Sequence, residues 1–153
     1  MSVSLTAPLL RATTSTFEEL ALLFAFPDDA LAAAPVHASA AVHFDGPSAG
    51  RLALGVSAPV LPAIATNMLG ADAAPDAALQ RDALGELANV VCGNVVPSLA
   101  DAAAVFRLRA PESAAGDAAM QAGAGETMVG EVRLTLDEGS AIARLFVRDV
   151  GSP

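Results

Sequence analysis

Glu86 and Asn89 have the residue types and the spacing that could do chemistry, within the run Gly-Glu-Leu-Ala-Asn-Val-Val-Cys-Gly-Asn at residues 85–94. Side chains three residues apart are neighbours on one face of a helix. A carboxylate can pair with a lysine or arginine of a partner. A carboxamide donates and accepts hydrogen bonds at once, so it can orient a water molecule. Neither group is a nucleophile, and the pair therefore suits a reaction whose electrophile and metal ion belong to another molecule.

A long helix is expected to position this pair. Asp76 can cap its N-terminus, the helix runs at least to Cys92, and Pro97 predicts a kink or break between Gly93 and Ser98. The apolar positions of the helix fall within one arc of roughly 100°, which predicts its core face. These positions are Leu84, Leu87, Ala88, Val91 and Val95.

The opposite arc of the helix is expected to face solvent and to meet a partner. Besides the Glu-x-x-Asn pair it carries Gly93, which leaves out a side chain and would let another surface come close. Asp82 lies one turn before the pair, and Val90 and Val96 flank the arc, where we expect an exposed apolar rim. We therefore predict partner docking at Asp82, Val90, Gly93 and Val96.

The rest of the chain predicts an α+β fold in the order α-β-β-α-α-β-β-β. Strands are expected where apolar and polar residues alternate, and helices where apolar residues recur every three or four positions. The expected elements are a helix over 16–26, strands over 36–44 and 51–57, a helix over 58–69, the helix from 76, a strand over 103–110, and a hairpin of 131–136 with 141–147. Because the strands come in hairpins, the sheet should be mainly antiparallel, with long helices packed on it.

The ends and the longest connection are expected to be irregular. Residues 1–14 resemble a loose N-terminal tail, followed by a single domain over 15–150. A capping box formed by Ser15 and Thr16 with the glutamates that follow predicts the start of the first helix. Residues 111–127 are rich in Ala and Gly without a clear period, which predicts a long loop.

Composition and charge limit the classes of function. The chain has 153 residues, of which 54% are hydrophobic, and a formal charge of −9, and all eight of its basic residues are arginines. The hydrophobic content excludes a disordered protein, and the acidic charge disfavours nucleic acid and anionic membranes as partners. No apolar run could span a bilayer and the N-terminus does not resemble a signal peptide, so we expect a cytoplasmic protein.

Two other sets of candidate residues carry little chemistry. The single cysteine, Cys92, allows no internal disulfide and no cysteine-based zinc site, and its position predicts a small buried hydrophobe. His37, His43 and Asp45 share strand parity, but the two histidines would be about 20 Å apart along an extended strand. We therefore predict no metal site of the chain's own.

The motif in its context resembles the CheX/CheC family of chemotaxis phosphatases, and most closely its CheX-like members, which carry one Glu-x-x-Asn motif. The resemblance spans about residues 15–148. It implies that Asn89 orients a water for attack on the phospho-aspartate of a CheY-like response-regulator receiver domain, while Glu86 pairs with the receiver's lysine. It also implies that the receiver supplies the Mg²⁺, that the chain needs no cofactor of its own, and that the chain forms a homodimer.

Several alternatives stay open at this point. The same fold could be a non-catalytic module that binds a receiver or a flagellar component, or a small-ligand domain with a pocket between helix and sheet. The first helix contains Glu19-Leu-Ala-Leu22, which matches Glu86-Leu-Ala-Asn89 except at its last position. This similarity indicates either a repeat whose first copy lacks the amide or a coincidence in an Ala- and Leu-rich chain. The net charge of −9 should also slow encounter with an acidic receiver unless arginines such as Arg81 lie at the docking face.

Overall fold

A single antiparallel sheet of seven strands organises the part of the chain that the structure, a computed structural model, describes: residues 4–28, 35–101 and 103–148. The strand order is β1-β6-β7-β3-β2-β4, and β5 pairs with β2 beside β4. The strands are β1 (Ala25–Pro27), β2 (Ala38–Asp45), β3 (Gly50–Val56), β4 (Arg107–Leu108), β5 (Glu112–Ala115), β6 (Glu126–Leu136) and β7 (Gly139–Arg148). The helices are α1 (Thr6–Ala21), α2 (Val60–Leu69) and α3 (Ala77–Val95), with short 3₁₀ turns η1 (Ala71–Ala73), η2 (Val96–Leu99) and η3 (Ala118–Met120).

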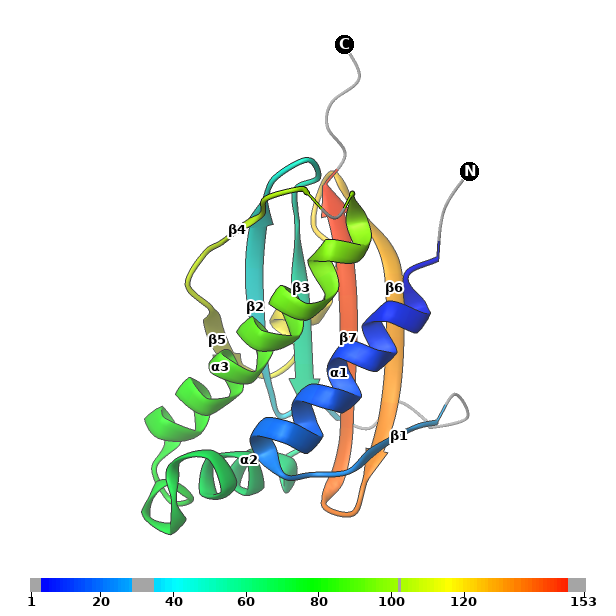
Figure 1. Cartoon of the computed structure of the whole chain (residues 1–153). Helices are drawn as coiled ribbons and strands as arrows, with labels where there is room; N and C mark the ends of the chain where they lie inside the picture. The colour runs from blue at the N-terminus through cyan, green and yellow to red at the C-terminus, as the bar shows by residue number, and fades with distance from the viewer. Residues whose placement is uncertain (1–3, 29–34, 102, 149–153) are drawn as a thin grey trace.

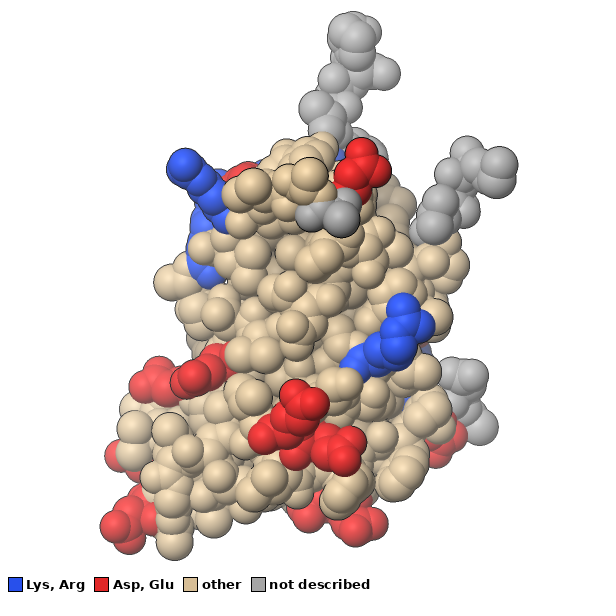
Figure 2. All heavy atoms as spheres, in the orientation of Figure 1, with Lys and Arg blue, Asp and Glu red and all other residues tan. Residues whose placement is uncertain are grey.

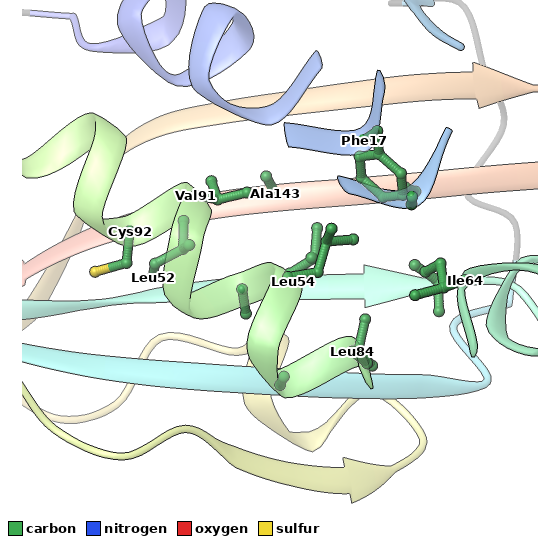
Figure 3. Close-up of a cluster of buried hydrophobic side chains, with 14 of the residues drawn as sticks. Phe17, Leu52, Leu54, Ile64, Leu84, Val91, Cys92 and Ala143 are labelled. Atoms are coloured by element: carbon green, nitrogen blue, oxygen red, sulfur yellow. The ribbon is translucent and has the colours of Figure 1, made fainter. Parts of the chain in front are cut away.

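The two long helices α1 and α3 lie side by side across one face of the sheet (Figure 1). The core lies between them and the strands. Side chains of Phe17 on α1 and of Leu84 and Val91 on α3 gather over Leu52 and Leu54 of β3 (Figure 3), and all five are fully buried. Burying one such side chain contributes about 1.5–3 kcal/mol, so this apolar face anchors α3 to the sheet. The predicted core face of α3 and the predicted α+β class are confirmed.

The ends of α3 lie where the sequence predicts them. The Asp76 carboxylate accepts hydrogen bonds from the backbone N–H groups of Ala78 and Leu79, which satisfies two donors of the first turn. The α-helix ends at Val95, and the chain continues through Pro97 as the 3₁₀ turn η2. Because Pro97 cannot donate a backbone hydrogen bond, the α-helix cannot extend through it.

The prediction of a loose tail over residues 1–14 is wrong for the residues that the structure describes, since α1 already begins at Thr6. Leu9 is fully buried, and its packing stabilises the N-terminal part of α1. The hydroxyls of Thr13 and Thr16 donate to the carbonyls of Leu9 and Ala12 at 2.7 Å each. These threonines therefore lie inside a helix, and the predicted capping box does not form.

The predicted helix over 16–26 also ends earlier, at Ala21. Leu22 adopts a left-handed conformation with φ of 55°, and its backbone N–H bonds back to the Phe17 carbonyl. The chain then forms β1, which was not predicted and which pairs with the end of β6.

The region between α3 and β6 is more ordered than predicted. The expected strand over 103–110 reduces to the two residues of β4, while the expected loop over 111–127 contains β5, η3 and the start of β6. The Ser39 hydroxyl donates to the Gly116 carbonyl at 2.8 Å, and the Arg51 guanidinium bonds the carbonyls of Ala119 and Gln121. Side chains of β2 and β3 thus hold this segment over the second face of the sheet, and no local sequence pattern encodes that contact.

The sheet has an internal symmetry of strand order. The first half of the chain supplies α1, β1, β2 and β3, and the second half supplies α3, β4, β6 and β7. Exchanging the halves leaves the order β1-β6-β7-β3-β2-β4 unchanged. The edge strand of each half pairs with the other half, and β3 and β7 meet at the centre. The symmetry relates the strands of the two halves, but Glu19 lies in the last turn of α1 whereas Glu86 lies in the middle of α3, so it does not place the two glutamates at equivalent positions.

The central strands and the closing hairpin lie close to their predicted positions. The predicted strands over 36–44 and 51–57 and the closing hairpin are confirmed as β2, β3, β6 and β7, with ends shifted by up to five residues. Gly70 ends α2 with φ of 105°, a conformation that glycine adopts at little cost. Within the described residues, no helix combines the length and apolar character that crossing a bilayer requires.

Candidate functional site

The Glu86 and Asn89 side chains lie on the outer side of α3, as their spacing predicts. Glu86 is exposed and Asn89 is partly exposed. Among the described residues, neither side chain has a hydrogen-bond or ion-pair partner within the chain. Both functional groups therefore stay available to a second molecule.

The pair borders an open trough of about 380 Å³ between α3 and the segment that leads into β5. One wall consists of Asp82, Gly85, Glu86 and Asn89, and the other of Pro111 and Ser113. The site is thus neither a convex helix face nor a closed cavity. Pro111 and Ser113 were not predicted as site residues, because they fall in the segment that was expected to be a loop.

Gly85 allows the second wall to lie close to the helix. A Cβ atom at this position would lie 3.1 Å from Ser113 Oγ and 3.3 Å from Pro111 Cβ. The Ser113 hydroxyl also donates to the backbone carbonyl of Arg81 at 3.0 Å. A glycine inside a helix indicates close approach of another segment, and this signal was available in the sequence.

The predicted docking residues divide into two groups. Asp82 and Gly93 are exposed and Val90 is partly buried. A Cβ at position 93 would meet only Leu108 Cδ2, at 3.9 Å, so this part of the surface is open as expected. Val96, however, is only 3% exposed, and the prediction of an exposed apolar rim there is wrong. The chain turns into η2 at this point, and Val96 packs into the core.

Charges are distributed unevenly over the face that carries α1 and α3. Figure 2 shows that this face is mostly uncharged, with acidic groups gathered over its lower half and a basic group over α1. On α3, the exposed Asp82 lines the trough, whereas the exposed Arg81 lines a separate pocket with His37 and Ala115. The repulsion expected between this acidic chain and an acidic partner therefore remains, because the described residues that line the trough include an aspartate and a glutamate but no arginine.

The remaining candidates do not contribute to the site. Cys92 is fully buried, and burial raises the pKa of its thiol to about 12, so it stays protonated and unreactive. Asp45 pairs with Arg109 at 3.1 Å. In the described ranges, no three His, Cys, Asp or Glu side chains are arranged to hold a metal ion.

Comparison with protein families identifies the chain. The family model described as chemotaxis phosphatase CheX matches residues 38–129, which include the whole of α3 and the trough. The chain belongs to the CheX family. No protein of curated function matches the sequence.

Solved structures of CheX proteins share the fold. A CheX from Desulfovibrio desulfuricans is 19% identical with a TM-score of 0.77, and the match covers 94% of this chain and 99% of that one. A CheX from Vibrio vulnificus is 19% identical with a TM-score of 0.76, covering 94% and 97%. The CheX of a CheX–CheY–BeF₃–Mg²⁺ complex from Borrelia burgdorferi is 18% identical with a TM-score of 0.66, covering 94% and 97%.

The run Glu19-Leu-Ala-Leu22, which matches the motif except at its last position, lies at the C-terminal end of α1. Glu19 is exposed on α1 as Glu86 is on α3. Leu22, at the position that matches Asn89, lies just beyond the end of α1 and is 66% exposed. This run therefore offers neither a carboxamide nor the helical turn that would carry one at residue 22.

Proposed function

We propose that the chain is a phosphatase that removes the phosphoryl group from the phospho-aspartate of a CheY-like receiver domain. The observation that carries this proposal is the pair Glu86 and Asn89, exposed and without partners in the chain, beside an open trough on a helix of a CheX-family fold. The solved Borrelia complex, which contains CheX with CheY and Mg²⁺, supports a receiver as the partner.

In this mechanism, Asn89 acts by positioning. Its carboxamide oxygen accepts a hydrogen bond from a water molecule and holds that water in line with the phosphorus atom. The water oxygen forms a bond to phosphorus while the bond from phosphorus to the aspartate oxygen breaks. Inorganic phosphate and the free aspartate carboxylate are the products. Mg²⁺ held by the receiver would supply the positive charge that the phosphoryl oxygens need during this step.

Glu86 would hold the receiver in register. Its carboxylate pairs with the receiver's active-site lysine, one turn of helix away from the carboxamide of Asn89. An exposed ion pair contributes only about 0.2–1 kcal/mol, and docking that removes water from the pair would strengthen it. Repulsion between an acidic receiver and this chain of charge −9 should slow their encounter.

The test is the decay of a phosphorylated receiver with Mg²⁺, with and without the protein. Asn89→Ala should abolish the acceleration. Asn94→Ala is the matched control, since Asn94 is an exposed asparagine on the same helix whose amide lies 3.5 Å from Thr16 on α1, away from the trough. Equal activity of wild type and Asn89→Ala would disprove the proposed role. Binding without acceleration would favour the alternative, a non-catalytic receiver-binding module.

We also propose that the chain forms a homodimer. β1 is a strand of three residues at the edge of the sheet, and Leu22, Phe24 and Phe26 beside it are 66%, 62% and 62% exposed. Sheet edges and exposed apolar patches are usually covered, and a second copy of the chain would cover both. Sedimentation should show a dimer at micromolar concentration that the double substitution Phe24→Ser with Phe26→Ser dissociates, and a wild-type monomer would refute this proposal.

A further inference from the structure

The trough beside Asn89 has two walls that come from distant parts of the chain, and only the α3 wall carries the motif. Gly85, Asn89 and Gly93 are spaced by four residues, so they follow one side of the helix. A Cβ at Gly85 would point at Ser113, and a Cβ at Gly93 would point at Leu108. Asn89 lies between these two positions and therefore faces the strip of chain from Leu108 to Ser113.

This strip is held in place before any partner arrives. Ser113 pairs with Ala40 of β2 in the sheet, and its hydroxyl donates to the Arg81 carbonyl on α3. Beyond β5, the Ser39 hydroxyl accepts a hydrogen bond from the Ala119 backbone N–H at 3.4 Å and donates to Gly116. The strip is thus tied to the helix on one side and to the sheet on the other, and Gly85 sets the width between the walls.

A folded partner that reaches Asn89 has to touch this strip. Protein interfaces of standard size bury about 800 Å² on each partner, far more than the side chains of Glu86 and Asn89 offer. The surface must therefore extend from α3 onto its neighbour. On the side that Asn89 faces, that neighbour is Pro111 and Ser113, the other lining of the trough.

We propose that the wall formed by Pro111 and Ser113 is a docking and specificity surface for the receiver domain, and that Gly85 positions it. This inference rests on the proposed function, because it takes the receiver as the occupant of the trough. The wall itself carries no charge: Pro111 supplies a rigid apolar contact and Ser113 a small polar one. It should therefore select receivers by the shape of the surface around their phosphorylation site, while Glu86 supplies the charge contact.

The test compares two neighbouring positions of β5. Ser113→Gln extends the side chain into the trough, whereas Ala114→Gln adds the same side chain to a residue that alternates to the other face of the strand and does not line the trough. Affinity is measured by calorimetry with a receiver loaded with Mg²⁺ and beryllium fluoride, and turnover is measured with the phosphorylated receiver. We expect Ser113→Gln to weaken affinity and raise KM at least tenfold with kcat within threefold, and Ala114→Gln to stay within twofold of wild type.

A second variant tests the same proposal if circular dichroism shows that Ser113→Gln does not fold. Gly85→Ala pushes the wall away from the helix and should weaken affinity by several fold without a change in secondary structure. Wild-type affinity of both Ser113→Gln and Gly85→Ala would overturn the proposal. Failure of the proposed function looks different: the wild-type protein then binds the loaded receiver without accelerating its decay, and the affinities of the variants still decide the role of the wall.

Discussion

The Ser113 hydroxyl donates a hydrogen bond to the Arg81 carbonyl at 3.0 Å and so ties β5 to the helix that carries Glu86 and Asn89. The two residues are 32 positions apart in the chain. Because of this contact, the site is a trough with two walls. The contact fixes the distance between β5 and the helix, and so the spacing of the two walls at which a partner would bind.

Asn89→Gln tests whether position rather than amide chemistry matters. The substitution keeps the carboxamide and moves it outward by one methylene group. Since a displacement of about 1 Å in a positioned group can cost about 100-fold in rate, we expect a loss of that order in receiver dephosphorylation, with affinity for the loaded receiver unchanged. A variant that retains more than half of the wild-type rate would show that Asn89 does not act by positioning a water.

The two glycines of α3 should respond differently to the same substitution. Gly93→Ala makes only an ordinary van der Waals contact, with Leu108 Cδ2 at 3.9 Å, and removes a residue of poor helix propensity, so it should raise the free energy of unfolding by about 0.5–1 kcal/mol. Gly85→Ala meets Ser113 and Pro111 at 3.1–3.3 Å, so the gain in propensity is offset by the displaced wall. Urea denaturation of both variants measures the difference. Equal stabilisation would mean that the wall yields freely.

The Arg51–Glu126 pair predicts an acid-sensitive fold. The two groups lie 2.9 Å apart, nearly buried, and the Arg51 guanidinium lowers the pKa of Glu126 below its usual 4.5. A carboxylate whose pKa is lower in the folded state than in the unfolded state stabilises the folded protein at pH values above the unfolded-state pKa. This contribution is lost as the pH falls through the folded-state pKa. The wild type should therefore lose stability progressively below about pH 4.5.

A variant that lacks the Glu126 carboxylate shows how much the Arg51–Glu126 pair contributes to stability at each pH. Glu126→Ala leaves the Arg51 cation uncompensated and should cost about 3–5 kcal/mol at pH 7. The stability difference between wild type and variant should shrink as the pH is lowered from 5 to 3. Thermal unfolding across that range measures it, and a difference that does not change with pH would contradict this assignment.

Leu22→Asn tests whether the first half of the chain can be given a working motif. Asparagine tolerates the left-handed conformation at this position better than leucine does, so the variant should fold with equal or slightly higher stability. It should not restore activity to Asn89→Ala, because α1 ends at Ala21 and residue 22 no longer follows the helix face. Recovery of dephosphorylation in the double variant would show that the first copy needs only the amide.

The elements that the sequence predicted correctly are those whose signals are local. For α3, Asp76 supplies a cap, the apolar period places Leu84 and Val91 in the core, and Pro97 ends the helix. The strands β2 and β3 follow from strict alternation, and the closing hairpin from its turn. In each case the local pattern and the tertiary packing require the same structure.

The elements that were missed depend on contacts with distant residues. The middle of α1 contains four hydroxyl residues in succession, Thr13 to Thr16, which have low helix propensity. Burial of Leu9 and bonds back to the helix carbonyls override that preference. The segment around β5 shows no periodic sequence pattern. Side chains from outside it hold it in place, because Ser39 and Arg51 donate hydrogen bonds to the carbonyls of Gly116 and Ala119. Val96 was misplaced because periodicity was extended past the end of the helix.

The edge strand of each half of the chain pairs with a strand of the other half, and this determines when the site can fold during synthesis. Glu86 and Asn89 leave the ribosome before β6 and β7, but β3, on which α3 packs, lacks its central neighbour until β7 has been made. The first hundred residues therefore lack β6 and β7, against which α1 packs, and leave part of the apolar core uncovered. Neither half is a self-sufficient unit, so a nascent or truncated chain that already contains the motif should remain inactive until its last strand is in place.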